Sequence, residues 1–97
     1  MRIEHSETAT KGVFHALNEA GERIGEMSYS RAGDTLIIID HTEAYEGHEG
    51  QGVGRELVAA GVMHAREHSL KVLPLCPYAL VQFKRNKDYA DVWKQAR

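Results

Sequence analysis

Residues 47–58, GHEGQGVGRELV, carry four glycines within eight positions and then change abruptly into helix-forming sequence. Glycine is costly to order, so this density indicates a backbone that turns tightly or approaches another group closely. A glycine loop that opens a helix also leaves the first N–H groups of that helix unpaired, and they form a positive dipole end that suits phosphate or pyrophosphate. The stretch therefore predicts an anion-binding loop or, in the simpler interpretation, a plain turn and helix start.

Three phosphate-binding patterns can be compared with this loop. The Walker pattern needs a lysine and then Ser or Thr after its last glycine, whereas Arg55 and Glu56 follow Gly54. The dinucleotide pattern G-x-G-x-x-G, started at Gly50, needs a glycine at position 55 and also fails. What remains is the six-residue form (R/Q)-x-x-G-x-(G/A) opening a helix, whose glycines match Gly52 and Gly54.

Before the loop, three strand candidates are separated by turn residues and predict an antiparallel meander. The third is apolar on both faces, as a central strand covered on two sides would be. The polar stretch that follows it is expected to be a loop. The strands are expected at 13–18, 23–30 and 35–40, and the loop at 41–50.

After the loop, apolar residues at helical spacing predict a helix over 53–69, followed by a short branched apolar strand within 70–77. Proline 77 opens a second helix over 77–86, and Asp88 starts a short final helix over 88–95 with Tyr89, Val92 and Trp93 on its inward face. A strand reached through a helical crossover is expected to be parallel to its neighbour. The sequence thus predicts a mixed α/β sheet, a meander followed by a helical crossover to a parallel strand, with two C-terminal helices.

The bulk composition limits the classes of protein that fit. Ninety-seven residues, 42% of them apolar, suffice for one small domain with a real core, so we expect a single domain over 1–97. A net charge of −2 argues against nucleic acid as a partner, and no apolar run suits a membrane span. The N-terminal residues lack the apolar core of a secretory signal, and a single cysteine fits a reducing compartment. We therefore expect a cytoplasmic protein.

The chain resembles the GNAT superfamily of acetyl-CoA-dependent N-acetyltransferases, and more narrowly its small single-domain branch, which consists of little beyond the acetyl-CoA-binding core. The resemblance runs from about residue 13 to residue 93 and is most specific at HTEA (41–44), GQGVG (50–54) and P-x-C-P-Y (74–78). It implies that main-chain amides of the loop hold the pyrophosphate of CoA, and that the pantetheine arm lies between the strands ending at His41 and Leu75. The cofactor-binding residues that we carry over are Thr42, Glu43, Gln51, Gly52, Val53, Gly54, Arg55, Lys84 and Lys87.

Three positions, in two motifs, depart from the family pattern. The Arg or Gln that starts the six-residue motif falls on Glu49, so a side-chain contact to phosphate from this position is lost while the main-chain contacts survive. Many members also carry an Asn-x-x-Ala-x-x-hydrophobic-Tyr stretch whose tyrosine protonates the leaving thiolate. Aligned on Ala79, its asparagine falls on Cys76 and its tyrosine on Phe83, and Tyr78 is out of register to replace it.

Two side chains are candidates for the chemistry of acetyl transfer. Cys76 lies near the expected thioester and at a helix start, where it would act as a nucleophile or as a proton donor to the CoA thiolate; the alternative is a small buried hydrophobe. His41 directly follows a buried strand and is suited to accept the proton of an amine; the alternative is a structural histidine. Glu43 is a further candidate to receive that proton through water; the alternative is a solvated side chain.

The remaining charged and histidine residues have weaker interpretations. Lys84 and Lys87 belong to the basic cluster KRNK, which in this fold can reach the 3'-phosphate of CoA, or is an ordinary solvated helix end. His64 and His68 have the i, i+4 spacing of metal ligands, but no third ligand lies nearby in sequence, so we expect no metal.

The leading prediction is an enzyme that passes acetyl from acetyl-CoA to an amine, either a protein lysine or a small molecule. The chain has almost none of the flanking elements from which GNAT enzymes build acceptor sites. Its acceptor groove would therefore be shallow, shared with a partner subunit, or open to a protein substrate. The alternative is a CoA-binding module without efficient catalysis.

Overall fold

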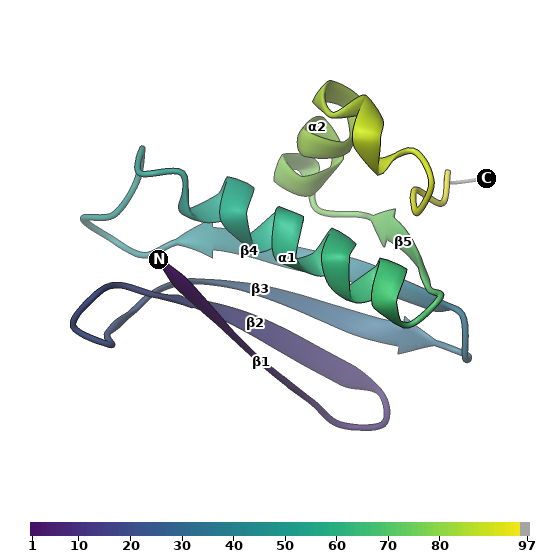
Figure 1. Cartoon of the computed structure of the whole chain (residues 1–97), viewed down its shortest axis with the longest axis horizontal. Coiled ribbons are helices and arrows are strands. Elements are labelled where there is room, and N and C mark those ends of the chain that lie inside the picture. Colours follow the sequence, from purple (N-terminus) through teal and green to yellow (C-terminus); the bar gives the residue numbers. More distant parts are fainter. Residues whose placement is uncertain (96–97) are drawn as a thin grey trace.

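The computed structural model describes residues 1–95 and consists of one five-stranded sheet with two α-helices (Figure 1). The strands follow one another across the sheet in chain order; the first four are antiparallel to their neighbours, and the last pairs in parallel with the fourth. The predicted mixed sheet with a helical crossover is therefore confirmed. The elements are β1 Arg2–Glu7, β2 Lys11–Leu17, β3 Arg23–Ala32, β4 Leu36–Ala44, α1 Val53–Glu67, β5 Lys71–Pro74, α2 Pro77–Arg85 and the 3-10 turn η1 Lys87–Tyr89.

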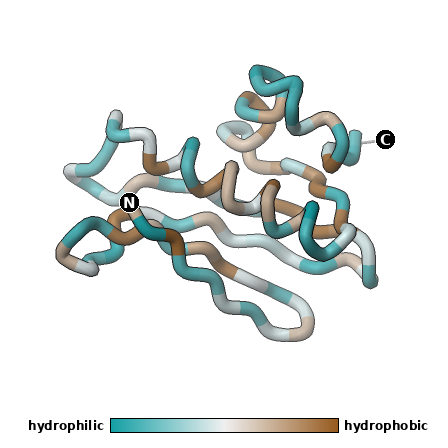
Figure 2. Tube along the Cα trace, viewed as in Figure 1, coloured by the Kyte–Doolittle hydropathy of each residue, from teal (hydrophilic) through white to brown (hydrophobic). Residues whose placement is uncertain are grey.

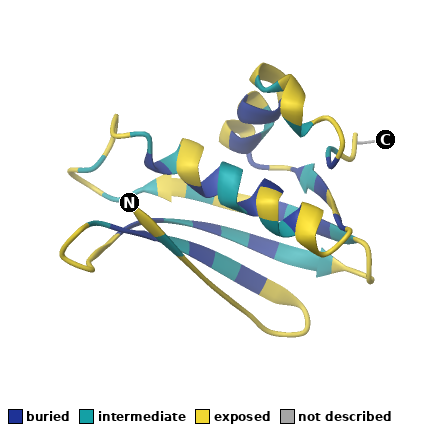
Figure 3. Ribbon diagram, in the orientation of Figure 1, coloured by how far each residue is buried: buried dark blue, intermediate teal, exposed yellow. Residues whose placement is uncertain are grey.

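The core lies between the sheet and α1, with α2 packed beside β5 (Figure 1). Apolar residues recur along α1 and β4 (Figure 2), and α1 is buried on the side that meets the sheet (Figure 3). The predicted apolar face of α1 is confirmed: its buried residues are Val53, Leu57, Val58, Gly61, Val62 and Ala65. Within residues 1–95, no helix is both long and apolar enough to cross a membrane.

The N-terminal strand β1 was not expected from the sequence. Every residue of it except Ile3 is exposed, so it lacks the alternation of buried and exposed positions that reveals a strand. Its main chain pairs along its whole length with β2, from Arg2 opposite Leu17 to Glu7 opposite Gly12. Backbone pairing at a sheet edge thus orders a segment whose side chains carry almost no signal.

The prediction of a loop from residue 41 is wrong, because β4 continues to Ala44. Its partner β3 is long enough to pair with this polar stretch, and Gly25 lies opposite Ala44. Ile39 pairs with Tyr29 and His41 with Ser28, so Asp40 is the extra residue of a β-bulge. The expected loop is therefore limited to the residues between β4 and α1.

The prediction of a final helix over 88–95 is also wrong. Only the 3-10 turn Lys87–Tyr89 forms, and the chain then returns to β5, where Val72 forms a parallel bridge with Trp93. The Val72 N–H donates to the carbonyl of Val92 at 2.7 Å, and the Lys94 N–H donates to the carbonyl of Val72 at 2.8 Å. The free edge of β5 offers these groups to the chain end, and pairing them outweighs the helical pattern.

We expect Gly25→Ala to destabilise the fold by about 1–3 kcal/mol, because a Cβ at this position overlaps a side-chain methyl of Val53 and lies 2.7 Å from the carbonyl oxygen of Glu43. Chemical denaturation of both proteins measures the difference in free energy of unfolding. Gly21→Asn is the control, since Gly21 has a φ of +83° in open space, a conformation that asparagine tolerates. Equal effects of the two substitutions would contradict the close approach of α1 to β3.

Candidate functional site

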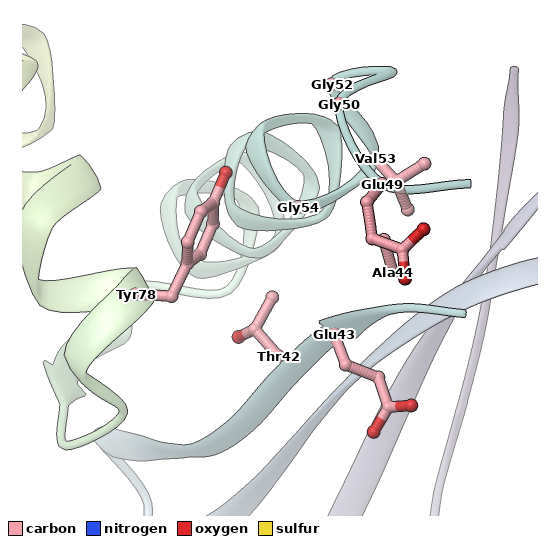
Figure 4. Close-up of a pocket in the computed structure, with 9 residues that line it drawn as sticks. All are labelled: Thr42, Glu43, Ala44, Glu49, Gly50, Gly52, Val53, Gly54 and Tyr78. Atoms are coloured by element: carbon pink, nitrogen blue, oxygen red, sulfur yellow. The ribbon is translucent and has the colours of Figure 1, made fainter. Parts of the chain in front are cut away.

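A cavity of about 330 Å³ lies where β4 has parted from β5 and α1 begins (Figure 4). The parallel pairing ends at Ile39 opposite Pro74, whereas β4 continues for five residues beyond it. The expected parting of the two strands is thus present, slightly earlier in each strand than the sequence indicated. The cavity is lined by β4, the glycine loop, the first turn of α1 and one residue of α2: Thr42, Glu43, Ala44, Glu49, Gly50, Gly52, Val53, Gly54 and Tyr78.

The glycine loop adopts backbone conformations that favour glycine. Gly47, Gly50 and Gly52 have φ angles of +88°, +80° and +81°. Gly52 is the N-cap of α1, and no side chain caps the helix there. The guanidinium of Arg55 lies over Gly52, with Nη2 only 2.7 Å from where a Cβ of Gly52 would stand. A helix N-terminus without a side-chain cap, beside a cationic side chain, is an arrangement that suits an anion.

Tyr78 forms the wall of the cavity on the α2 side. Its ring lies directly against Gly54, since a Cβ on Gly54 would come within 2.7 Å of two ring carbons. The Gln82 side-chain amide donates a hydrogen bond of 3.3 Å to the Tyr78 hydroxyl oxygen. Tyr78 had no role in the site predicted from the sequence, because the contact joins residues 24 positions apart on two different helices.

Thr42 faces the cavity from β4, and its hydroxyl is buried with no hydrogen-bond partner within residues 1–95. Thr42 pairs with the buried Met27, so both lie on the side of the sheet that α1 covers. In Figure 4 its side chain points toward Tyr78. A buried hydroxyl without a partner is costly, so this position favours a ligand that offers a polar group.

His41 and Glu43 lie on the opposite face of the same strand. They pair with Ser28 and Glu26, and the carboxylate of Glu43 points away from the cavity (Figure 4). The Nε2 atom of His41 is 2.5 Å from a carboxylate oxygen of Glu43, and both side chains are about half exposed. The bulge at Asp40 causes this arrangement, because strict alternation would have put His41 on the same face as Ile39.

Cys76 is the N-cap of α2 and is 7% exposed. Its N–H and that of Leu75 both donate to the carbonyl of Ile39 at 3.2 Å, so Cys76 lies at the point where the strands part. It is not among the residues that line the cavity. Phe83, which occupies the position of the family tyrosine, is buried and packs against Tyr89 and Trp93.

The structure brings together most, but not all, of the predicted cofactor-binding residues. Gln51 is exposed in the loop, where its side-chain oxygen is 3.4 Å from Nδ1 of His48. Lys84 lines a separate depression next to Leu75 and Trp93, and Lys87 is exposed at the start of η1. The two lysines therefore do not border the cavity at the glycine loop.

Comparison of the chain with known protein families and solved structures identifies the class of protein to which this fold and cavity belong. The sequence model of the GCN5-related N-acetyl-transferase family matches residues 13–92. This span includes every residue that lines the cavity. The chain belongs to this family, whose activity is the transfer of an acetyl group from acetyl-CoA. The resemblance inferred from the sequence is confirmed.

Three solved structures illustrate the likeness. A GCN5-like protein from Staphylococcus aureus, assigned as an N-acetyltransferase, is 31% identical with a TM-score of 0.71, and the match covers 97% of this chain and 90% of that one. An aminoglycoside acetyltransferase from a soil metagenome, in complex with sisomicin, is 23% identical with a TM-score of 0.65 over 80% of this chain and 57% of its own. A GNAT family N-acetyltransferase from Escherichia coli, in complex with CoA, is 24% identical with a TM-score of 0.61 over 72% of this chain and 42% of its own.

The three matches differ in what they support. The chain spans nearly all of the Staphylococcus aureus protein but only about half of the other two. The matches to the aminoglycoside and Escherichia coli enzymes, at 23% and 24% identity, show only that this chain has the same fold as they do. No curated protein matches the chain.

We expect Gly54→Ala to behave differently depending on residue 78. Alanine favours a helix over glycine by roughly 0.5–1 kcal/mol, but here its methyl group displaces the Tyr78 ring. The substitution should therefore be neutral or destabilising in the wild type and stabilising in a Tyr78→Ala background. Denaturant unfolding of the four proteins gives the coupling energy, for which we expect about 1 kcal/mol. Additive effects would contradict the packing of Tyr78 on Gly54.

Proposed function

We propose that this chain binds acetyl-CoA in the cavity at the glycine loop and transfers the acetyl group to a primary amine. The observation that carries the proposal is the continuity of the cavity, which joins the start of α1 to Thr42 beside the parted strands. The Escherichia coli relative was solved with CoA, which supports the same ligand class here. The proposed acyl-CoA-binding domain is the whole chain, 1–97, of which the last two residues lie outside the described range.

The pyrophosphate is proposed to lie on the N-terminus of α1. Gly50 leaves the main chain open to a bulky anion, since nothing lies within 4 Å of where its Cβ would stand, and Arg55 supplies a positive charge over Gly52. Glu49 lines the cavity, and its carboxylate accepts a hydrogen bond of 3.0 Å from the Gly47 N–H, which satisfies part of its negative charge. The acidic residue at the first motif position is thus compatible with an anionic ligand.

The acyl end of the ligand is proposed to lie between Thr42 and Tyr78. The unpartnered Thr42 hydroxyl can bond to a carbonyl of the arm or of the thioester. The Tyr78 phenol lies at the wall of the cavity. It is therefore a candidate to donate a proton to the departing thiolate, in place of the family tyrosine that this chain lacks. Cys76, buried at the end of β5, is the other candidate, either as that donor or as a nucleophile.

The amine is proposed to approach from the opposite face of the sheet, where His41 and Glu43 form a pair. In direct transfer the amine nitrogen bonds to the acetyl carbon and the carbon–sulfur bond breaks. His41 accepts the proton that the amine loses, and Glu43 orients the imidazole. In the route through cysteine, the acetyl group first moves from CoA to the sulfur of Cys76 and then to the amine.

The acceptor class that we propose is a cationic amine, either a lysine of a protein or a small molecule. Carboxylates on both sides of β4, those of Glu43 and Glu49, favour a positive charge near the cavity. The aminoglycoside acetyltransferase with a similar fold was solved with the polyamine sisomicin, which supports the amine class without identifying the acceptor.

Binding of CoA is tested with Gly52→Asp, because an aspartate there places a negative charge against the pyrophosphate. We expect calorimetry to show at least a ~100-fold weaker affinity for CoA, corresponding to about 2.7 kcal/mol. Gly33→Asp controls for the strain of aspartate at a positive φ, since Gly33 has a φ of +73° at a turn away from the cavity. Unchanged binding in Gly52→Asp, or no binding by the wild type, would exclude this site.

The route of transfer is tested by intact-protein mass spectrometry after incubation with acetyl-CoA, beside an amine-acceptor assay. The covalent route predicts one acetyl adduct on the wild type and none on Cys76→Ser. Direct transfer predicts no adduct, and kcat lowered by about 100-fold in His41→Ala, which removes the general base. CoA binding without turnover of any amine would favour the alternative, a CoA-binding module without efficient catalysis.

A further inference from the structure

A second cluster of polar side chains lies between β1 and the last turns of α1. It brings together His5 and Glu7 from the N-terminal strand and His64 from the helix, and none of the three lines the cavity at the glycine loop. A carboxylate oxygen of Glu7 is 3.7 Å from Nε2 of His5 and 3.9 Å from Nε2 of His64. One donor atom from each residue lies within 4.8 Å of the other two.

His64 is the member of this cluster whose hydrogen bonding is incomplete. Its Nε2 atom is buried and has no partner within residues 1–95, and its side chain is only 11% exposed. The other two are satisfied through Tyr29, whose hydroxyl donates to Glu7 at 2.6 Å and lies 2.6 Å from Nε2 of His5. A buried ring nitrogen without a partner, within 4.8 Å of a donor atom of a carboxylate and of a second imidazole, is placed to bind a ligand together with them.

The chemistry of the donors favours a transition metal. Two imidazoles and one carboxylate are a common ligand set for Zn²⁺, with a fourth position left to water or another side chain. Ligands about 2.1 Å from a tetrahedral ion stand ~3.4 Å apart, close to the observed gaps of 3.7 and 3.9 Å. An ion bound to Nε2 of His5 would take that atom from the Tyr29 hydroxyl, which lies 2.6 Å from it. Ca²⁺ is bound by oxygen ligands, so a set in which two of the three ligands are imidazoles does not suit it.

A further imidazole lies beside this ligand set. The ring of His68, one turn further along α1, has its centroid 4.4 Å from that of His64 and is a candidate for the fourth position.

We propose that His5, Glu7 and His64 bind a divalent transition ion, best matched by Zn²⁺, and that this ion fastens the exposed edge strand β1 to the C-terminal half of α1. A cation there also lies near the negative end of the helix dipole, which is favourable. Because the ion would bind the folded state alone, it would stabilise that state by mass action. This proposal does not depend on the proposed acetyltransferase activity.

The test is calorimetric titration of the EDTA-treated, dialysed full chain, without a histidine tag, with ZnCl₂, together with thermal unfolding at several zinc concentrations. We expect one zinc per chain, a melting temperature that rises with zinc, and at least ~10-fold weaker binding in Glu7→Gln and in His64→Gln. His48→Gln, a histidine of the glycine loop, is the matched control and should bind zinc like the wild type. His68→Gln decides whether the fourth ligand is a protein side chain.

Two further readouts keep the result clear. Far-UV circular dichroism establishes that each variant is folded, and His5→Gln on the exposed strand replaces His64→Gln if the latter does not fold. Visible absorption of bound Co²⁺ should show the bands of tetrahedral coordination in the wild type and lose them in the variants. No zinc uptake by the wild type, or uptake that Glu7→Gln leaves unchanged, would overturn the proposal.

Discussion

The site depends on the carbonyl oxygen of Ile39 as a hydrogen-bond acceptor. It is the last acceptor shared between β4 and β5, and it takes the N–H groups of both Leu75 and Cys76 at 3.2 Å. With both amides bound to one oxygen, β5 ends and α2 begins at Pro77, while β4 continues along β3. Polar backbone groups of β4 beyond this point therefore lie at an open edge, and an extended ligand can pair with them as a missing strand would.

The bulge at Asp40 completes this arrangement. It comes directly after Ile39 and resets the alternation of side chains along β4. Thr42 consequently faces α1 and the cavity, while the His41–Glu43 pair lies on the other side of the sheet. One extra residue thus separates the groups that would contact a cofactor from those that would contact an acceptor, so that both can reach the same gap between the strands.

Glycines let the two helices close around the gap. Gly54 admits the ring of Tyr78 against the first turn of α1, and Gly25 allows that turn to lie on β3. The glycine run was informative because the positive φ angles of Gly47, Gly50 and Gly52 are a local requirement of the turn. The identity of the residue that fills the space, Tyr78, could not be inferred, since it depends on how α2 packs against α1.

The sequence alone determined the order of most strands and helices, the buried face of α1, and the glycine loop at its start, because periodicity and turn chemistry act over a few neighbouring residues. It missed β1 and the true end of β4, where backbone pairing orders polar residues, and it assigned a helix to residues 88–95 that instead pair with β5.

Only the tertiary structure decided on which face His41 lies, that Lys84 and Lys87 stand away from the cavity, and that His5, Glu7 and His64 meet. These facts follow from contacts between segments far apart in the chain. The spacing of residues in the sequence does not show which distant segments the fold brings together, so it does not reveal these contacts by itself.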